Sequence, residues 1–338
     1  GLFFQLFLSV MDRPPNSRLF SILTSEEFEE LSLDIFRYQF TNNPVYRSYC
    51  QRLRKSPSEV SCCADIPFLP ITFFKSKKVM VSEKDVEIVF ESSGTTGSVT
   101  SRHYVSNVEI YHKSFTKAFT HFFGPMEDDC ILALLSAYLE REGSSLVYMV
   151  NEMVKRSNHP DSGFYLYNFD ELQSKLAQLE KNETKTLLIG VSFALLDMAE
   201  KYPTQLRYTQ IMETGGMKGK RKELIREALH AQLKNAFDVS EIYSEYGMTE
   251  LLSQAYSLGN GIFACPPWMK VATRDTEDPL SGQEYGKTGG INIIDLANID
   301  SCSFIATQDL GKVYEDGTFE ILGRFDHSDI RGCNLMAL

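Results

Sequence analysis

Residues 130–135 read CILALL, a run of six residues without a charged side chain. An unbroken apolar run of this length is typical of a strand that is buried on both faces of a parallel sheet. Around it, apolar periodicity predicts strands that alternate with helices, which indicates an α/β fold with helices layered on a largely parallel core sheet. The expected helices cover residues 145–156, 169–181 and 192–201, and the expected strands cover 186–191 and 208–213.

Capping residues and turns predict further elements on both sides of this core. The stretch from Thr24 to Glu27 reads as the start of a helix, and Asn107 as the cap of another helix that ends at Gly124. Apolar residues repeat with helical spacing over 224–237. From Ser240 onward short strands and turns dominate, which predicts a β-rich C-terminal subdomain.

Composition excludes several classes of protein. The 34 lysine and arginine residues face 45 aspartate and glutamate residues, a net charge of −11. This argues against nucleic acid as the main partner, because phosphate neutralisation dominates such binding. No apolar run reaches the roughly 18 residues of a transmembrane helix, so no transmembrane segment is expected. The 7 cysteines are scattered and odd in number, which indicates a reducing compartment and hence the cytoplasm.

A segment rich in serine, threonine and glycine follows a strand predicted over 86–90. It reads Ser92-Ser93-Gly94-Thr95-Thr96-Gly97, and such a loop suits a polyphosphate because glycine lets the backbone approach and hydroxyls donate hydrogen bonds. It lacks the Gly-Lys-Ser/Thr ending of a P-loop, which disfavours that class of NTPase. Arg102 and His103 follow and could add positive charge. Taken alone, the segment could equally be a plain turn beside two surface residues.

A second segment reads Tyr246-Gly247-Met248-Thr249-Glu250. A carboxylate after a tight glycine turn can hold Mg²⁺, which prefers one or two carboxylates together with phosphate oxygens. The ring of Tyr246 could cover a purine, and the pair Gly215-Gly216 offers another backbone for close approach. Without further support, each of these is an ordinary loop.

A third set of features lies near the end of the sequence. Asp309 lies in the segment Thr307-Gln308-Asp309-Leu310-Gly311, and an aspartate at a strand end can accept hydrogen bonds from both hydroxyls of a ribose. Arg324 lies in the tetrapeptide Gly-Arg-Phe-Asp. Cys333 follows, although a free cysteine by itself is most often a small buried apolar residue.

The order of these segments resembles that of the adenylate-forming enzymes, the superfamily of acyl-CoA synthetases and peptide-synthetase adenylation domains. There, a Ser/Thr/Gly loop precedes a glycine-rich adenine segment, Tyr-Gly-x-Thr-Glu, a ribose aspartate and Gly-Arg-x-Asp. The resemblance extends from about residue 65 to the end of the sequence. Two stretches, 134–149 and 328–336, resemble more narrowly the acyl-protein synthetases, the LuxE-type subunits of bacterial luminescence fatty-acid reductase.

The resemblance implies ATP and Mg²⁺ as cofactors and assigns roles to individual residues. The phosphates would be bound by Ser92, Ser93, Gly94, Thr95, Thr96 and Gly97, the adenine framed by Gly215, Gly216 and Tyr246, and the ribose held by Asp309 and Arg324. Thr249 and Glu250 would meet the α-phosphate, with Glu250 as the Mg²⁺ ligand. Tyr138, Ser144 and Ser145 would border the acyl pocket, and Cys333 would accept the acyl group as a thioester.

The chain departs from the superfamily after Arg324. Other members carry a large C-terminal lid with a lysine that assists adenylation, whereas here only a short tail follows and no lysine occurs after Lys312. We therefore expect an adenylate-forming α/β core over residues 1–322, with its β-rich subdomain from about 240, and no large lid. Residues 323–338 would form a hinge and a short tail that carries Cys333.

The leading prediction is an ATP-dependent acyl-protein synthetase. It would activate a fatty or related carboxylic acid as acyl-AMP and transfer the acyl group to Cys333 for delivery to an acceptor protein such as an acyl reductase. One alternative is a carboxylate–CoA or carrier-protein ligase that passes the acyl adenylate directly to an external thiol. Another is a catalytically silent nucleotide-binding scaffold that keeps the fold.

Overall fold

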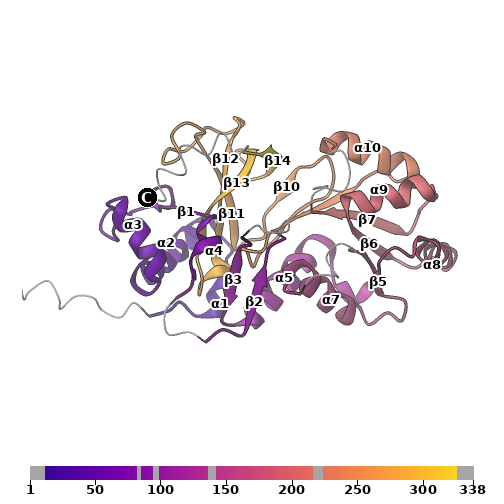
Figure 1. The fold of residues 1–338 in the computed structure, drawn as a ribbon, viewed down its shortest axis with the longest axis horizontal. Coiled ribbons are helices and arrows are strands. Elements are labelled where there is room, and N and C mark those ends of the chain that lie inside the picture. Colours follow the sequence, from indigo (N-terminus) through magenta and orange to yellow (C-terminus); the bar gives the residue numbers. More distant parts are fainter. Residues whose placement is uncertain (1–11, 82–84, 94–98, 136–141, 216–223, 326–338) are drawn as a thin grey trace, which may run out of the picture.

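The computed structural model describes residues 12–81, 85–93, 99–135, 142–215 and 224–325. The described strands form one large mixed sheet and a separate two-stranded ribbon, and helices lie on both sides of the large sheet (Figure 1). The large sheet has a parallel half and an antiparallel half, which differ in what they contribute to the candidate site.

The parallel half is built from the middle of the chain. Its strands are β4 (Cys130–Leu134), β5 (Gly163–Tyr165), β6 (Thr186–Val191), β7 (Thr209–Thr214) and β8 (Tyr243–Tyr246). They lie in the order β8-β7-β6-β4-β5, and each pairs in parallel with its neighbour. Every residue of β4 and β6 is buried, as an apolar run between two helical layers requires. The predicted parallel core is therefore confirmed.

The antiparallel half comes from the C-terminal part of the chain. Its strands are β9 (Ala255–Ser257), β10 (Phe263–Ala264), β11 (Met269–Arg274), β12 (Gly289–Asp295), β13 (Phe304–Val313) and β14 (Phe319–Arg324). They continue from β8 in the order β9-β10-β14-β13-β12-β11, and β1 (Leu69–Pro70) joins β13 in parallel. The division of the chain into a core over 1–322 and a tail over 323–338 stays a prediction.

The predicted helix caps form as side-chain hydrogen bonds. At the start of α2 (Ser25–Asn42), Thr24 Oγ1 accepts from the Glu27 N–H at 3.2 Å, and the Glu27 carboxylate accepts from the Thr24 N–H. Asn107 caps α5 (Val108–Phe123), which ends at Gly124 with φ of +85°, a conformation that glycine adopts without strain. The other described α-helices are α1 (Asn16–Leu19), α3 (Pro44–Arg52), α4 (Phe73–Ser76), α7 (Ser145–Ser157), α8 (Phe169–Lys181), α9 (Ser192–Lys201) and α10 (Arg226–Phe237).

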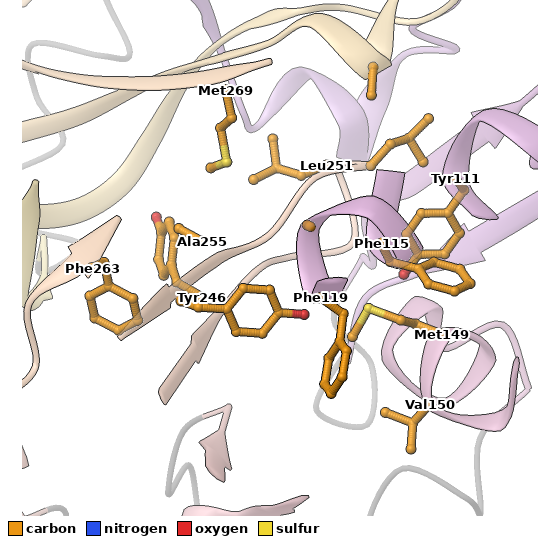
Figure 2. Packing of buried hydrophobic residues seen from close by; sticks show 14 of the residues in the cluster. Tyr111, Phe115, Phe119, Met149, Val150, Tyr246, Leu251, Ala255, Phe263 and Met269 are labelled. Atoms are coloured by element: carbon orange, nitrogen blue, oxygen red, sulfur yellow. The ribbon is translucent and has the colours of Figure 1, made fainter. Parts of the chain in front are cut away.

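Two layers of helices enclose the parallel half (Figure 1). On one face α9 packs against α10, β6 and β7, and on the other face α7 packs against α5 and β4. Figure 2 shows Tyr111, Phe115 and Phe119 of α5 beside Met149 and Val150 of α7, and all of these side chains are buried. The side chains between α5, α7 and the sheet are therefore largely apolar.

A ribbon of β2 (Ile88–Glu91) and β3 (Arg102–Val105) lies near the junction of the two halves, and α4 packs against β3 (Figure 1). The two strands pair antiparallel, so the loop that joins them begins and ends at the same edge of the ribbon. This loop is the Ser/Thr/Gly-rich segment that the sequence predicts to bind phosphate. The ribbon therefore positions its two ends.

Buried polar groups attach α2 to the antiparallel half. The Gln39 side-chain amide donates to the carbonyl oxygens of Asn298, at 3.0 Å, and Ile299, at 2.9 Å. The Asn43 amide donates to the carbonyl of Ser301 at 2.9 Å. Leaving a buried acceptor unpaired costs about 1–3 kcal/mol, so these bonds hold the short helix η3 (Leu296–Asn298) in place.

Among the described helices, none has the length and apolarity needed to cross a bilayer.

Candidate functional site

The residues singled out in the sequence gather where several strands end. Gly215 directly follows β7 and Gly247 directly follows β8, and these strands run parallel, so both glycines lie at the same edge of the sheet. Ligands of open α/β sheets bind at the carboxyl ends of the strands. This edge lies next to the antiparallel half, because Tyr246 at the end of β8 contacts Asp309 in β13.

Asp309 is the buried centre of a polar cluster that reaches the surface at Arg324. Its carboxylate accepts a hydrogen bond from Tyr246 Oη at 2.7 Å and another from Arg324 Nε at 3.2 Å. The register of β13 and β14 places Asp309 directly opposite Arg324. Burial, together with the negative charge of Asp309, holds the pKa of Tyr246 well above its usual range, so the phenol stays a hydrogen-bond donor. The predicted ribose pair and the predicted adenine aromatic therefore contact one another.

Glu250 lies with its carboxyl group in a largely enclosed position, only 7% exposed. Burial raises its pKa, although a hydrogen bond from the Ser101 side chain and the positive charges of Arg324 and Lys75 oppose the shift. A cation bound beside this carboxyl group would offset the cost of its burial. Within the described residues, no three His, Cys, Asp or Glu side chains gather to form a metal site made of protein alone. A single carboxylate fits Mg²⁺, which takes its remaining ligands from phosphate and water.

His103 lies in β3, the strand after the predicted phosphate loop, and connects it to the loop that carries Thr249. Its Nδ1 lies 2.8 Å from the carbonyl oxygen of Thr249, and since a carbonyl can only accept, Nδ1 carries the proton. Burial lowers the pKa of His103 to about 4, so the ring is neutral at physiological pH. The sequence-based expectation that His103 adds positive charge is therefore wrong, because burial outweighs the hydrogen bond to Thr249.

A small cavity with space for about one water molecule lies behind His103. His103 and Asn298 are among the residues that line it, and within the described part of the chain neither Nε2 of His103 nor Oδ1 of Asn298 has a hydrogen bond of good geometry. Asn298 donates its amide to the carbonyl of Glu250 at 2.7 Å. The carbonyls of Thr249 and Glu250 are thus held from two sides, by β3 and by η3.

The ends of the predicted phosphate loop are joined by hydrogen bonds. The Ser92 N–H donates to the carbonyl of Ser101 at 3.0 Å, and the Ser101 N–H donates to Ser92 Oγ at 2.8 Å. Ser93 is exposed. Arg102 pairs with Glu91 at 3.1 Å on the surface, where an ion pair contributes little to stability. Residues 94–97 lie outside the described residues.

Gly215 adopts a left-handed conformation, with φ of +71°, and its carbonyl accepts a hydrogen bond from Ser192 Oγ at 3.1 Å. Ser192 also donates to Glu213, which accepts from Ser244 Oγ at 2.7 Å and lies 3.3 Å from Nε2 of His230. Burial works to raise the pKa of Glu213, but His230, Arg226 and Ser244 outweigh it and the pKa is lowered. The backbone at Gly215 is therefore held by a charge-compensated network. Gly216 lies outside the described residues.

The opposite face of β8 differs from this network. Glu245 accepts a hydrogen bond from Thr214 Oγ1, and burial raises its pKa to about 7, helped by the negative charge of Glu213. The negative charge of Glu245 also helps to raise the pKa of Tyr111 in α5. The Tyr111 hydroxyl donates to the carbonyl of Ser145 at 2.9 Å. Glu245 therefore lies on the face of the sheet that α5 and α7 cover.

The predicted acyl-pocket residues on α7 are found at its first turn. Ser144 is the N-cap and its hydroxyl accepts from the Val147 N–H at 3.3 Å, and Ser145 is the first helical residue. Ser145 is buried beneath Tyr111. Tyr138 and Cys333 lie outside the described residues, and so do the terminal residues 328–336.

The structure adds residues that the sequence interpretation missed or misjudged. No sequence pattern near Asn298, Lys75 or Glu245 marks them as part of the site. Their partners lie far away in the sequence or on a neighbouring strand. His103 is visible in the sequence, but its neutral state follows from burial, which no local pattern reveals.

Comparison with known proteins supports the same interpretation. A model of the family described as "Acyl-protein synthetase, LuxE" matches residues 21–135. A long-chain-fatty-acid–luciferin-component ligase of Vibrio harveyi is 24% identical over 322 residues, which cover 89% of this chain and 84% of that protein. The protein of the same description from Aliivibrio fischeri is 22% identical over 338 residues, covering 91% of this chain and 86% of that protein.

Solved structures resemble the fold at low sequence identity. A 2-hydroxyisobutyryl-CoA ligase, solved with 2-HIB-AMP and CoA, superposes with a TM-score of 0.66 at 12% identity, over 93% of this chain and 74% of that chain. ATP-bound MatB from Rhodopseudomonas palustris gives a TM-score of 0.55 at 16% identity, over 71% of this chain and 48% of that chain, so the match spans about half of MatB. The resemblance to LuxE-type acyl-protein synthetases and the adenylate-forming fold is therefore confirmed.

Proposed function

We propose that this chain is an ATP-dependent acyl-protein synthetase that activates a fatty or related carboxylic acid as acyl-AMP and then carries the acyl group on Cys333. The observation that carries the proposal is the cluster of Tyr246, Asp309 and Arg324, with Glu250 on the loop that follows Tyr246, at one edge of an adenylate-forming fold. The relatives named as long-chain-fatty-acid ligases support a fatty acid as the substrate.

Asp309 would bind the ribose of ATP through its carboxylate. Two carboxylate oxygens offer about four acceptor positions, so the bonds from Tyr246 and Arg324 leave capacity for both ribose hydroxyls. A hydrogen bond to a charged group contributes about 1.5–3 kcal/mol. The two existing bonds hold Asp309 in position before the nucleotide arrives.

The first half-reaction forms the acyl adenylate. A carboxylate oxygen of the acid attacks the α-phosphorus, an O–P bond forms, the bond from Pα to the bridging oxygen breaks, and pyrophosphate leaves with the electron pair. Charge increases on the phosphate oxygens in this step, and preorganised donors and cations there lower the barrier most. Glu250 would hold Mg²⁺, which neutralises phosphate charge when bound.

The second half-reaction transfers the acyl group to the enzyme. The thiolate of Cys333 attacks the carbonyl carbon, a C–S bond forms, the bond from the carbon to the phosphate oxygen breaks, and AMP leaves. The thiol proton passes to solvent. The thioester would then be delivered to an acyl-accepting protein such as an acyl reductase.

A compartment that keeps thiols reduced suits such a thioester. The described cysteines, Cys50, Cys62, Cys63, Cys130, Cys265 and Cys302, are all free. Disulfides are rare where glutathione and thioredoxin act. These free thiols support the cytoplasm as the place of the reaction.

A second candidate is a carboxylate–CoA ligase that passes the adenylate to an external thiol. The observation that favours it is the similarity of the fold to a 2-hydroxyisobutyryl-CoA ligase that was solved with CoA. The two candidates share the first half-reaction and differ in the acceptor. The two candidates can therefore be distinguished by whether Cys333 accepts the acyl group.

The test is the intact mass of the purified chain after incubation with Mg-ATP and carboxylic acids from short to long. We expect a mass gain equal to one molecule of the carboxylic acid less one water, abolished in Cys333→Ala and retained in the control Cys62→Ala. A gain that survives Cys333→Ala would refute this cysteine as the acceptor. No gain with any acid, together with acid-dependent AMP release in the presence of CoA, would favour the second candidate.

A further inference from the structure

Residues 313–338 contain no lysine, so this part of the chain offers no ammonium group to the phosphates of ATP. Adenylation nevertheless releases pyrophosphate, whose charge must be balanced as the bond to the α-phosphate breaks. Two of the arginines near the described site already have carboxylate partners, because Arg324 pairs with Asp309 and Arg102 with Glu91. A further cation beside Glu250 would balance this charge.

The short helix α4 lies beside this site and is held there by its buried aromatic residue. Phe74 is 1% exposed and packs edge-to-face on His103, with ring centroids 5.8 Å apart. His103 in turn binds the carbonyl of Thr249 at 2.8 Å. Because Phe74, His103 and Thr249 form a continuous set of contacts, α4 has a fixed position relative to the loop of Thr249 and Glu250.

Lys75 directly follows Phe74 on this helix. It is exposed, and its charge acts on the buried carboxyl group of Glu250. Within the described residues, no carboxylate forms a salt bridge with Lys75. Lys78 differs in its surroundings, since its Nζ lies over the ring of Tyr104, 5.4 Å from the ring centroid.

We propose that Lys75 binds the β- and γ-phosphates of ATP and stabilises the leaving pyrophosphate. The inference rests on the proposed function, because it assigns a residue to the same half-reaction. The ammonium group gives up no proton and forms no covalent bond. It balances the negative charge that the bridging oxygen receives with the electron pair when the bond to Pα breaks.

Three variants test the proposal, with two measurements on each. Lys75→Ala removes the ammonium, Lys75→Arg keeps a cation of different shape, and Lys77→Ala removes a neighbouring exposed lysine as the matched control. The first measurement is the rate of acid-dependent pyrophosphate release. The second is the rise in melting temperature caused by Mg-ATP compared with the rise caused by AMP, which needs no turnover.

We expect Lys75→Ala to slow pyrophosphate release by about 100-fold, Lys75→Arg to recover part of the rate, and Lys77→Ala to behave as the wild type. The stabilisation by Mg-ATP should fall in Lys75→Ala while the stabilisation by AMP is unchanged, because AMP lacks the β- and γ-phosphates. A normal rate and a normal Mg-ATP effect in Lys75→Ala would overturn the proposal. So would equal losses with ATP and AMP, which indicate a merely structural role.

Failure of the proposed function has a different signature. If the wild type releases no pyrophosphate with any acid, the ligase assignment fails, while the comparison of Mg-ATP with AMP still decides whether Lys75 binds the terminal phosphates. A wild type that Mg-ATP does not stabilise would overturn both.

Discussion

Glu245 and Tyr246 are neighbours in β8, yet their side chains lie on opposite faces of the sheet, as successive residues of a strand must. Tyr246 donates to Asp309, which also binds the guanidinium of Arg324. Glu245 accepts a hydrogen bond from Thr214, and the charge that acts on it is the negative charge of Glu213. One face carries a carboxylate held by a phenol and a guanidinium, and the other holds a carboxyl group whose pKa burial raises to about 7.

The difference shows that burial alone does not set the charge state of a carboxyl group. Glu213 and Glu245 are both enclosed and lie on adjacent strands, but the pKa of Glu213 is lowered and that of Glu245 is raised. Burial acts in the same direction on both. Hydrogen bonds from His230 and Ser244 and the positive charge of Arg226 reverse its effect only for Glu213.

The largest expected effect comes from substituting Asp309, the predicted ribose ligand. Asp309→Ala removes the acceptor of Tyr246 and Arg324, and we expect kcat/KM for ATP in acyl-adenylate formation to fall by about 100-fold, since two hydrogen bonds from the ribose to a charge are lost. Glu315→Ala, which removes an exposed carboxylate in the turn before β14, is the matched control. Equal kinetics in Asp309→Ala and wild type would remove Asp309 from the ribose site.

The next largest effect concerns Glu245, on the opposite face of β8, and the pH dependence of the free energy of unfolding. Because the pKa of Glu245 rises from an ordinary 4.5 to about 7 on folding, the folded state holds a proton that the unfolded state has lost between these values. Its stabilising contribution is complete below the unfolded pKa and is lost as pH rises through the folded pKa. From pH 5 to pH 8 this amounts to about 2.5 kcal/mol.

Glu245→Gln should therefore gain about 2.5 kcal/mol of unfolding free energy relative to wild type as pH rises from 5 to 8. Urea unfolding at several pH values measures this difference, and Glu315→Ala serves again as the control. A constant difference across the range would show that Glu245 does not titrate near neutral pH.

His103 should give a smaller effect of opposite sign. Its pKa falls from an ordinary 6.5 to about 4 on folding, so the unfolded state binds the proton first as the solution is acidified. Wild type should lose about 1.5 kcal/mol of unfolding free energy between pH 6.5 and 5 relative to His103→Asn. Asparagine offers a donor in place of Nδ1 for the Thr249 carbonyl and has no titration in this range. Parallel pH profiles for the two proteins would contradict a buried neutral imidazole.

The smallest effect tests the N-cap of α7, beside the predicted acyl pocket. Ser144→Ala removes the N-cap hydrogen bond to Val147, and we expect a loss of about 1 kcal/mol in unfolding free energy. Ser174→Ala, at an exposed position within α8, should change stability by less than about 0.5 kcal/mol. Equal stabilities of the two variants would show that the cap contributes nothing measurable.

The elements of the parallel half could be predicted from the sequence because their signals are local. β6 (Thr186–Val191), α8 (Phe169–Lys181) and α9 (Ser192–Lys201) have the bounds that apolar runs and periodicity predict. The predicted capping residues Thr24 and Asn107 are also confirmed. Local signals suffice where a residue's partners are its neighbours in sequence.

The chemistry of the site depends on partners that the sequence does not bring together. His103 and Thr249 are 146 residues apart, and Tyr246 and Asp309 are 63 apart. The motifs predicted that Tyr246 and Asp309 belong to one site, but the hydrogen bond between them follows from the pairing of sheet halves. The neutral ring of His103 follows from burial, for which the sequence near it has no marker.

Acid-dependent exchange of labelled pyrophosphate into ATP tests the central claim most directly, because it reports formation of the acyl adenylate without requiring any acceptor. The account predicts exchange in the wild type only when Mg²⁺ and a suitable carboxylic acid are both present, and its loss in Asp309→Ala and Glu250→Gln. A wild-type chain that Mg-ATP stabilises but that exchanges no pyrophosphate with any acid, from short to long, would contradict it.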